Sequence, residues 1–116
     1  MTQNQQIEEH VADLRKRQAE SWPKGVSRNI TYRLGKVPMS QYVRAEAKAR
    51  PDAAMVHYYG RTLSWAEIDG ASDRFAGLLQ ARGVAAGDRV AVMMGNCPQF
   101  LICFWGIMKL GAILVP

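Results

Sequence analysis

Residues 60–116 read GRTLSWAEIDGASDRFAGLLQARGVAAGDRVAVMMGNCPQFLICFWGIMKLGAILVP, and this stretch decides the fold of the 116-residue chain. Short apolar runs in it alternate with longer runs of helical periodicity. That alternation is typical of βαβ units and predicts an α/β fold with a largely parallel sheet. Parallel strands are normally covered on both faces, so the last strand, Ala112–Val115, is expected to need polypeptide beyond Pro116. The sequence therefore predicts an incomplete domain, the opening part of a larger protein.

A β-hairpin and a well-marked helix are expected around the start of this stretch. Ala54–Tyr59 and Arg61–Leu63 read as two strands, and Gly60 supplies the positive φ that a tight hairpin turn requires. Residues 64–67, Ser-Trp-Ala-Glu, have the pattern of a capping box, in which the Ser and Glu side chains satisfy free backbone N–H groups. The helix is expected to end at Gly83, because glycine is common just past helix ends.

A βαβ unit is expected to follow. Arg89–Met94 predicts a strand that is apolar on both sides, so that both sides are expected to be covered. Pro98 suits the first turn of a helix, with Asn96 or Cys97 as the N-cap. Residues 100–110 are apolar nearly all round, which predicts a central helix.

The first third of the chain has a different character. Residues 1–37 are expected to form a helical extension and a linker, and residues 38–116 the first portion of the main domain. A helix is predicted over residues 5–20, with Ile7, Val11 and Leu14 on one face. Residues 21–38 lack apolar periodicity, and a second helix is expected over residues 39–49.

The charge balance argues against a nucleic-acid partner. The formal charge is +5, and residues 1–50 hold ten Lys/Arg and five Asp/Glu, whereas residues 51–116 hold five of each. The surplus is spread among acidic residues, which is typical of a solvated surface. Met1 is followed by polar residues and not by a secretory signal, and reduced cysteines would fit a cytoplasmic location.

A membrane anchor at residues 100–115 is an alternative interpretation of this apolar stretch. The uninterrupted apolar run covers nine residues before Lys109, whereas a spanning helix needs about 20. At most, peripheral membrane contact is expected.

Several patterns come close to known chemistry. Residues 106–111 have the glycine spacing of a phosphate-binding loop, but Ala112 and Ile113 stand where Lys and Ser/Thr are required. His10 and His57 fall in different elements, which disfavours a shared catalytic site. Asp69 and Asp73 share a helical face and resemble a carboxylate pair, but they are expected on the solvent side of the helix.

The two cysteines, Cys97 and Cys103, are expected to be small apolar residues of a buried helix. Neither a metal site nor a disulfide is expected, because six residues along a helix separate the side chains by about 9 Å. From motifs alone, the sequence assigns no catalytic, cofactor-binding or metal-binding residue.

Four segments in this order resemble the N-terminal part of adenylate-forming (AMP-binding) enzymes. They are residues 60–67 (GRTLSWAE), 83–91 (GVAAGDRVA), 96–100 (NCPQF) and 106–112 (GIMKLGA). Arg50-Pro51-Asp52-Ala53-Ala54 also fits. Within that superfamily, the chain is most similar to medium- or long-chain fatty acyl-coenzyme A synthetases, over residues 38–116.

The resemblance implies that the parent protein is an acid–thiol ligase. Such an enzyme converts a small-molecule carboxylic acid and ATP, with Mg²⁺, to an acyl-adenylate and pyrophosphate, and coenzyme A then displaces AMP. The chain would supply the start of the large N-terminal α/β domain, and the parent could be a homodimer. The acid and its chain length are left open.

The family's chemical motifs have no match here. The resemblance places the Ser/Thr/Gly-rich phosphate loop, the adenine- and magnesium-holding segment, the ribose-binding aspartate and the C-terminal lysine outside these 116 residues. Tyr59–Leu63 imitates one of these motifs, but Leu63 stands where Glu is needed. The chain alone is therefore expected to be inactive and to bind no ATP, Mg²⁺ or coenzyme A. The alternatives are a small non-catalytic α/β binding module and a membrane-associated small protein.

Overall fold

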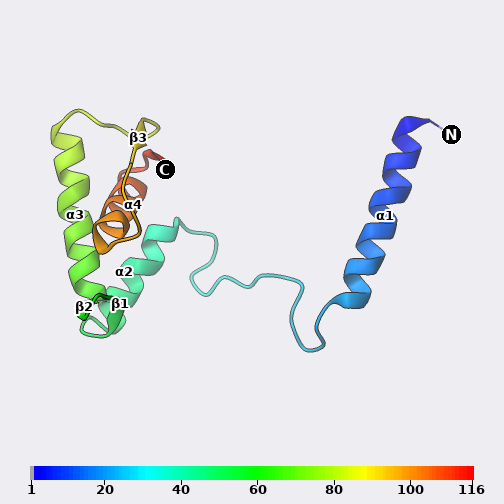
Figure 1. Cartoon of the computed structure of the whole chain (residues 1–116), viewed down its shortest axis with the longest axis horizontal. Coiled ribbons are helices and arrows are strands. Elements are labelled where there is room, and N and C mark those ends of the chain that lie inside the picture. Colours follow the sequence, from blue (N-terminus) through cyan, green and yellow to red (C-terminus); the bar gives the residue numbers. More distant parts are fainter. Residues whose placement is uncertain (1) are drawn as a thin grey trace. The chain divides into compact units, whose positions relative to one another are not determined.

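The structure is a computed structural model that describes residues 2–116. The chain divides into two compact units, Met1–Arg33 and Leu34–Pro116, and each is described by itself. The first unit is built on helix α1 (Gln3–Ser21), and the second contains every strand found in residues 2–116 (Figure 1). The division into a helical extension and linker over residues 1–37 and the first portion of a domain over residues 38–116 stays a prediction.

Helix α1 is fixed at both ends by local hydrogen bonds. Thr2 is the N-cap of a capping box with Gln5, which extends the helix two residues before the predicted start at residue 5. At the other end, the Ser21 hydroxyl donates to the Arg17 carbonyl (3.0 Å), and Arg28 Nη2 donates to the Ala19 carbonyl (2.8 Å). These bonds satisfy backbone groups that a helix end leaves unpaired.

The second unit has the α/β architecture expected from residues 60–116. Its elements in chain order are α2 (Met39–Ala49), β1 (Ala54–Tyr58), β2 (Arg61–Ser64), α3 (Trp65–Ala81), β3 (Arg89–Ala91), α4 (Pro98–Leu110) and β4 (Ile113–Val115). Strands β1 and β2 form an antiparallel hairpin, and β3 and β4 form a separate parallel pair joined through α4. The predicted hairpin and βαβ unit are confirmed.

The signals at the hairpin and at the start of α3 act as expected. Gly60 has φ 77°, and Tyr59 before it has φ 45°, so both central residues of the turn are left-handed, as in a type I′ hairpin. The Ser64 hydroxyl accepts from the Glu67 N–H (3.2 Å), and the Glu67 carboxylate accepts from the Ser64 N–H (2.8 Å). The hairpin therefore passes directly into a capped helix.

The core of the second unit lies between α3, α4 and the parallel pair. Ile107 of α4 is fully buried, and it clusters with Val92 and Ala112. Partly buried side chains of the neighbouring elements pack around this cluster: Phe75, Leu79, Val84, Val90, Phe100, Cys103, Leu110 and Leu114. The placement of Ile107 confirms that α4 is central to this unit.

The expected strand Arg89–Met94 is shorter than predicted and is not covered on both sides. Strand β3 ends at Ala91, because its partner β4 is only three residues long and the last bond joins Val92 N–H to the Val115 carbonyl (2.8 Å). Met93 is 98% exposed. The predicted strand was too long because the apolar alternation continues to Met94, whereas β4 pairs with β3 only as far as Ala91.

Strand β4 pairs with β3 alone among the strands described in residues 2–116. Ile113 and Val115 are 45% and 41% exposed, so the side chains of this strand are only partly shielded. Within the described residues, no helix combines the length and apolar character needed to cross a membrane.

Candidate functional site

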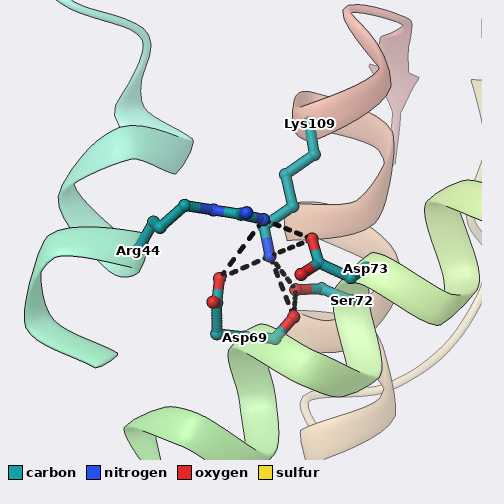
Figure 2. A network of polar contacts seen from close by, with 5 residues as sticks. All are labelled: Arg44, Asp69, Ser72, Asp73 and Lys109. Carbon is teal, nitrogen blue, oxygen red and sulfur yellow. Dashed lines mark hydrogen bonds and ion pairs between the residues drawn. The ribbon is translucent and has the colours of Figure 1, made fainter. Parts of the chain in front are cut away.

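A polar cluster centred on Lys109 lies where α2, α3 and α4 meet (Figure 2). Lys109 stands near the end of the apolar helix α4, and its side chain is 9% exposed. Its ammonium donates to two oxygens of Asp69, the carbonyl (2.9 Å) and Oδ1 (2.5 Å), and to Ser72 Oγ (2.9 Å) and Asp73 Oδ1 (2.8 Å). Four acceptors thus surround a group that has three protons to donate.

The cluster is closed on its outer side by Arg44 of α2. Arg44 Nη2 lies 2.5 Å from Asp73 Oδ1 and 4.0 Å from Asp69 Oδ1. The Arg44 side chain is 41% exposed, so this outer pairing is more accessible to water than the Lys109 contacts. Two carboxylates therefore face two cations, and the cluster is electrically balanced.

The helical period explains why α3 presents these groups together. Asp69, Ser72 and Asp73 stand at positions i, i+3 and i+4, which share one helix face. Ser72 is fully buried, and its hydroxyl donates to the Asp69 carbonyl (2.9 Å) while its oxygen accepts from Lys109. A short hydroxyl side chain thus lets the lysine reach the backbone of α3.

Gly106 brings α3 and α4 close enough for these bonds to form. A Cβ atom at this position would lie 2.8 Å from Phe75 Cδ1 and 2.9 Å from the Ser72 carbonyl oxygen. Both distances are shorter than atoms in contact normally allow, so a side chain would push the helices apart. Because Gly106 and Lys109 are three residues apart, the close approach and the lysine lie along the same face of α4.

Two titratable groups near this part of the fold are shifted. Burial by itself raises the pKa of Asp73, but the hydrogen bond and charge of Lys109, together with Arg44, outweigh burial and lower the pKa below 3.8. For Cys103 of α4, burial raises the thiol pKa above 9.0, and the neighbouring Cys97 adds to the effect. Asp73 is thus held as a carboxylate, and Cys103 as a thiol.

The position predicted for Asp69 and Asp73 was wrong in one respect. Asp69 does not face solvent, because its side chain is 15% exposed and turns toward Lys109 and Arg44. Asp73 is 46% exposed, as expected of the solvent side, although its carboxylate also pairs with both cations. Sequence reasoning missed Lys109 and Arg44 as partners. The available signal was the single charge within residues 100–110, because a lysine in a packed apolar helix needs acceptors.

The structure does not bring the other candidates together. His57 lies on β1 with Nδ1 3.0 Å from Thr62 Oγ1, and His10 lies on α1 in the first unit. The phosphate-loop-like residues 106–111 belong to α4 and its end, where Gly111 adopts φ 75°. Cys97 is the N-cap of α4, one of the two residues expected there, so the expectation that it lies within the helix is wrong. Both cysteines are free and half-buried.

The donor set of the cluster does not fit a magnesium ion or a nucleotide phosphate. The carboxylates of Asp69 and Asp73 already face the two cations of the cluster, and Lys109 makes all its bonds within the protein. Within the described residues, no three His, Cys, Asp or Glu side chains gather as metal ligands would. The cluster is a set of ion pairs and hydrogen bonds that hold α2, α3 and α4 together.

Comparison with known proteins places the second unit in a family. Residues 43–116 match the AMP-binding enzyme family. The long-chain-fatty-acid–CoA ligase of Bacillus subtilis is 38% identical over 76 residues, which are 65% of this chain and 14% of that protein. The crotonobetaine/carnitine–CoA ligase of Salmonella paratyphi A is 43% identical over 56 residues, 48% of this chain and 11% of that protein.

A solved structure shares the fold as well as the sequence. The fatty acyl CoA synthetase of Mycobacterium tuberculosis is 33% identical, superposes with a TM-score of 0.60, and covers 66% of this chain and 16% of its own length. The chain thus spans about one seventh of the length of such relatives. Because the family match covers most of the second unit, including α3, β3, α4 and β4, the chain belongs to the AMP-binding enzyme family.

Proposed function

We propose that this chain is the N-terminal part of an ATP-dependent acid–CoA ligase and that it acts there as a folding scaffold. The parent enzyme would join a small carboxylic acid, with a fatty acid as the first choice, to coenzyme A through an acyl-adenylate. ATP, Mg²⁺ and coenzyme A would be held by other parts of the parent. The observation that carries this proposal is the similarity of the second unit to proteins named as CoA ligases.

The geometry of the Lys109 cluster supports a scaffold role. Phosphoryl transfer needs cations and metal ligands directed at the reacting phosphate. Here the Lys109 ammonium is surrounded by protein oxygens, and its side chain is 9% exposed. Its role in the parent would be to fix α4 against α3 and so to hold β4 in register with β3.

The first test measures chemistry in the chain by itself. Purified 116-residue protein is assayed for acid-dependent ATP–pyrophosphate exchange with medium- and long-chain fatty acids. We expect no exchange above the background without protein, because no described group is placed to stabilise the reacting phosphate. Exchange that depends on both the chain and the acid would contradict the scaffold role.

The second test asks whether the chain can serve in a ligase. In the Bacillus subtilis long-chain-fatty-acid–CoA ligase, the segment that aligns with this chain is replaced by residues 43–116. We expect the chimera to keep fatty-acid-dependent exchange and acyl-CoA formation. A chimera that is soluble and has the melting temperature of the unaltered ligase, but lacks both activities, would refute the proposal.

A matched pair of variants separates folding from chemistry in the chimera. Arg44→Met alters the exposed rim of the cluster and should leave activity near that of the chimera. Lys109→Met removes the ammonium and should lower thermal stability first, with activity lost only as the protein unfolds. If Lys109→Met instead abolished exchange at a temperature where the chimera stays folded, Lys109 would have a catalytic role.

A further inference from the structure

A pocket lies within the second unit, between α2 and the irregular residues 34–38 that precede it. Its volume is about 480 Å³, and pockets of this size are typical of sites for small organic molecules. We call it the α2 pocket. None of the residues that line it is acidic.

Helix α2 forms one wall of the α2 pocket. Gln41, Arg44, Ala45 and Lys48 stand at positions i, i+3, i+4 and i+7, so they share one face of the helix. The opposite face packs into the unit, where Val43 is 3% exposed. The pocket therefore lies on the side of α2 that points away from the packed interior.

Residues 34–38 form the other wall, and hydrogen bonds hold them against α2. The Tyr42 hydroxyl accepts from the Leu34 N–H (3.2 Å) and donates to the Gly35 carbonyl (3.1 Å). Within the segment, the Val37 N–H donates to the same carbonyl (3.1 Å). The wall is therefore ordered before a ligand arrives, and binding does not have to bear the entropic cost of ordering it.

The lining of the α2 pocket combines apolar side chains with two cations. The cations, Arg44 and Lys48, stand four residues apart on α2 and are therefore neighbours on its surface. Four of the other lining residues are apolar: Leu34, Val37, Pro38 and Ala45. An apolar surface beside positive charge complements a molecule that has an alkyl body and an anionic head group.

The charge balance around the pocket indicates how many charges the head group carries. Arg44 Nη2 pairs with Asp73 at 2.5 Å, so a carboxylate of the protein already balances this cation. Arg50, two residues beyond Lys48, pairs with Glu46 at 2.6 Å. Among the residues that the structure describes, no carboxylate pairs with Lys48. One unbalanced cation is matched by one negative charge, which favours a carboxylate over a doubly charged phosphate.

We propose that the α2 pocket binds a carboxylate that carries an alkyl chain. The carboxylate lies at the Lys48 ammonium, and the chain lies along Leu34, Val37 and Ala45. This inference stands apart from the proposed ligase function, because it rests on the contacts of residues 34–48. The chimera made with residues 43–116 lacks one wall of the pocket, so either proposal can fail while the other holds.

The first measurement is isothermal titration calorimetry of the full 116-residue chain with decanoate. The salt concentration is about 0.15 M, and the ligand is kept below the concentration at which it forms micelles. We expect one site per chain. The affinity should rise about two- to threefold with each methylene from butanoate to decanoate, because more apolar surface is buried. Decyltrimethylammonium has the same chain and the opposite charge, and it should bind about tenfold more weakly.

Variants of the lining locate the ligand. Lys48→Gln should weaken decanoate binding about threefold, and Lys48→Glu about tenfold, because the ion pair is accessible to water. Ala45→Leu fills the pocket from the helix wall and should also weaken binding. Circular dichroism should show equal helix content in all variants.

Lys36→Gln is the matched control, because it removes a cation from the segment 34–38 without changing the lining of the pocket. It should leave the dissociation constant within about twofold of the wild-type value. A loss equal to that of Lys48→Gln would show a general attraction of charge and would overturn the assigned site. So would a wild-type chain that does not bind decanoate, equal affinity for decyltrimethylammonium, or unchanged binding in Lys48→Glu. Binding to anionic phospholipid vesicles but not to free decanoate would show a membrane surface instead, and the proposal would be wrong.

Discussion

Lys109 and Asp69 form a charge pair with side chains that are 9% and 15% exposed, so neither charge is well hydrated. Removing the lysine would leave the Asp69 carboxylate facing the interior without its closest cation. We expect Lys109→Met to lower the free energy of unfolding by about 2–4 kcal/mol, since breaking one partner of a buried pair is strongly destabilising. Urea unfolding of the 116-residue chain, followed by circular dichroism, measures the loss.

Arg44→Met is the control for this prediction at the exposed rim of the same cluster. Its guanidinium is 41% exposed, and pairs accessible to water contribute about 0–1 kcal/mol. The lysine change should therefore cost clearly more than the arginine change. Equal losses for the two variants would show that Lys109 is not held as Figure 2 depicts it.

Asp73 is expected to make stability depend on pH. Burial raises its pKa, but Lys109 and Arg44 outweigh burial and bring the folded-state pKa below the ordinary value of 3.8. This contribution is therefore complete above the unfolded-state pKa and is lost as the pH falls through the folded-state pKa. Below about pH 4, the free energy of unfolding should fall more steeply in the wild type than in Asp73→Asn. Parallel urea titrations between pH 7 and pH 3 measure both slopes, and identical slopes would contradict the prediction.

Single residues were predictable only where their local sequence specifies their role. Gly60 and Ser64 were assigned correctly, because turns and caps depend on neighbours in the chain. Lys109 bonds residues 36 to 40 positions away, and no local pattern records such distant partners. The spacing of Asp69 and Asp73 gave their shared face, but not which way that face points.

Helices α3 and α4 depend on the absence of a side chain at their closest approach. In Gly106→Ala, the new Cβ would lie 2.8 Å from Phe75 Cδ1 and 2.9 Å from the Ser72 carbonyl. The helices must then separate, which should lower the free energy of unfolding by about 1–3 kcal/mol. Urea unfolding of the purified variant measures this change.

Gly77→Ala provides the matched control in α3. Nothing lies within 4 Å of a Cβ at this position, and its helical backbone accepts alanine readily. Alanine is the better helix former, so this variant should be more stable than the wild type by about 0.5–1 kcal/mol. If Gly106→Ala lowers the free energy of unfolding and Gly77→Ala raises it, packing decides the effect at Gly106 and helix propensity decides the effect at Gly77. A stabilising Gly106→Ala would contradict the close approach.

Whole elements were predicted best where start and stop signals agree. Helix α3 has a capping box at Ser64 and a left-handed glycine at Gly83, and its extent matched the expectation. Strand β3 was predicted too long, because Val92–Met94 continue the apolar alternation although β4 supplies only three paired residues. Strand length depends on the partner, and a partner distant in sequence is not visible in the strand itself.

At the scale of the whole molecule, the irregular segment at the end of the first unit should be the first site of proteolysis. Residues 23–33 are exposed and form no helix or strand. Under limiting trypsin, we expect the earliest cuts at Lys24 and Arg28, leaving a resistant product that contains α2 to β4. Mass spectrometry of early time points identifies the cuts. Initial cleavage at Arg61 or Arg82, inside the second unit, would contradict this order.

The order of elements in the second unit was predictable. Each strand or helix has its signals in its own stretch of sequence, and the family resemblance supports the same order. The separation of the strands into two sheets was not. It depends on which strands pair, and β1 with β2 and β3 with β4 leave no pairing between the two sets. The family relationship likewise rested on segments spread over residues 60–112, and no single motif could have carried it.

The close approach at Gly106 has a mechanical consequence. At Gly106 there is no space between α4 and the Phe75 ring and Ser72 carbonyl of α3 even for one added carbon. We therefore expect the helices to pivot about this position more easily than they slide past it. Lys109 lies three residues further along α4, and its bond to Asp69 holds the C-terminal end of α4 to α3. Strand β4 directly follows this end of α4. Its displacement should therefore be a small rotation about Gly106 and not a translation.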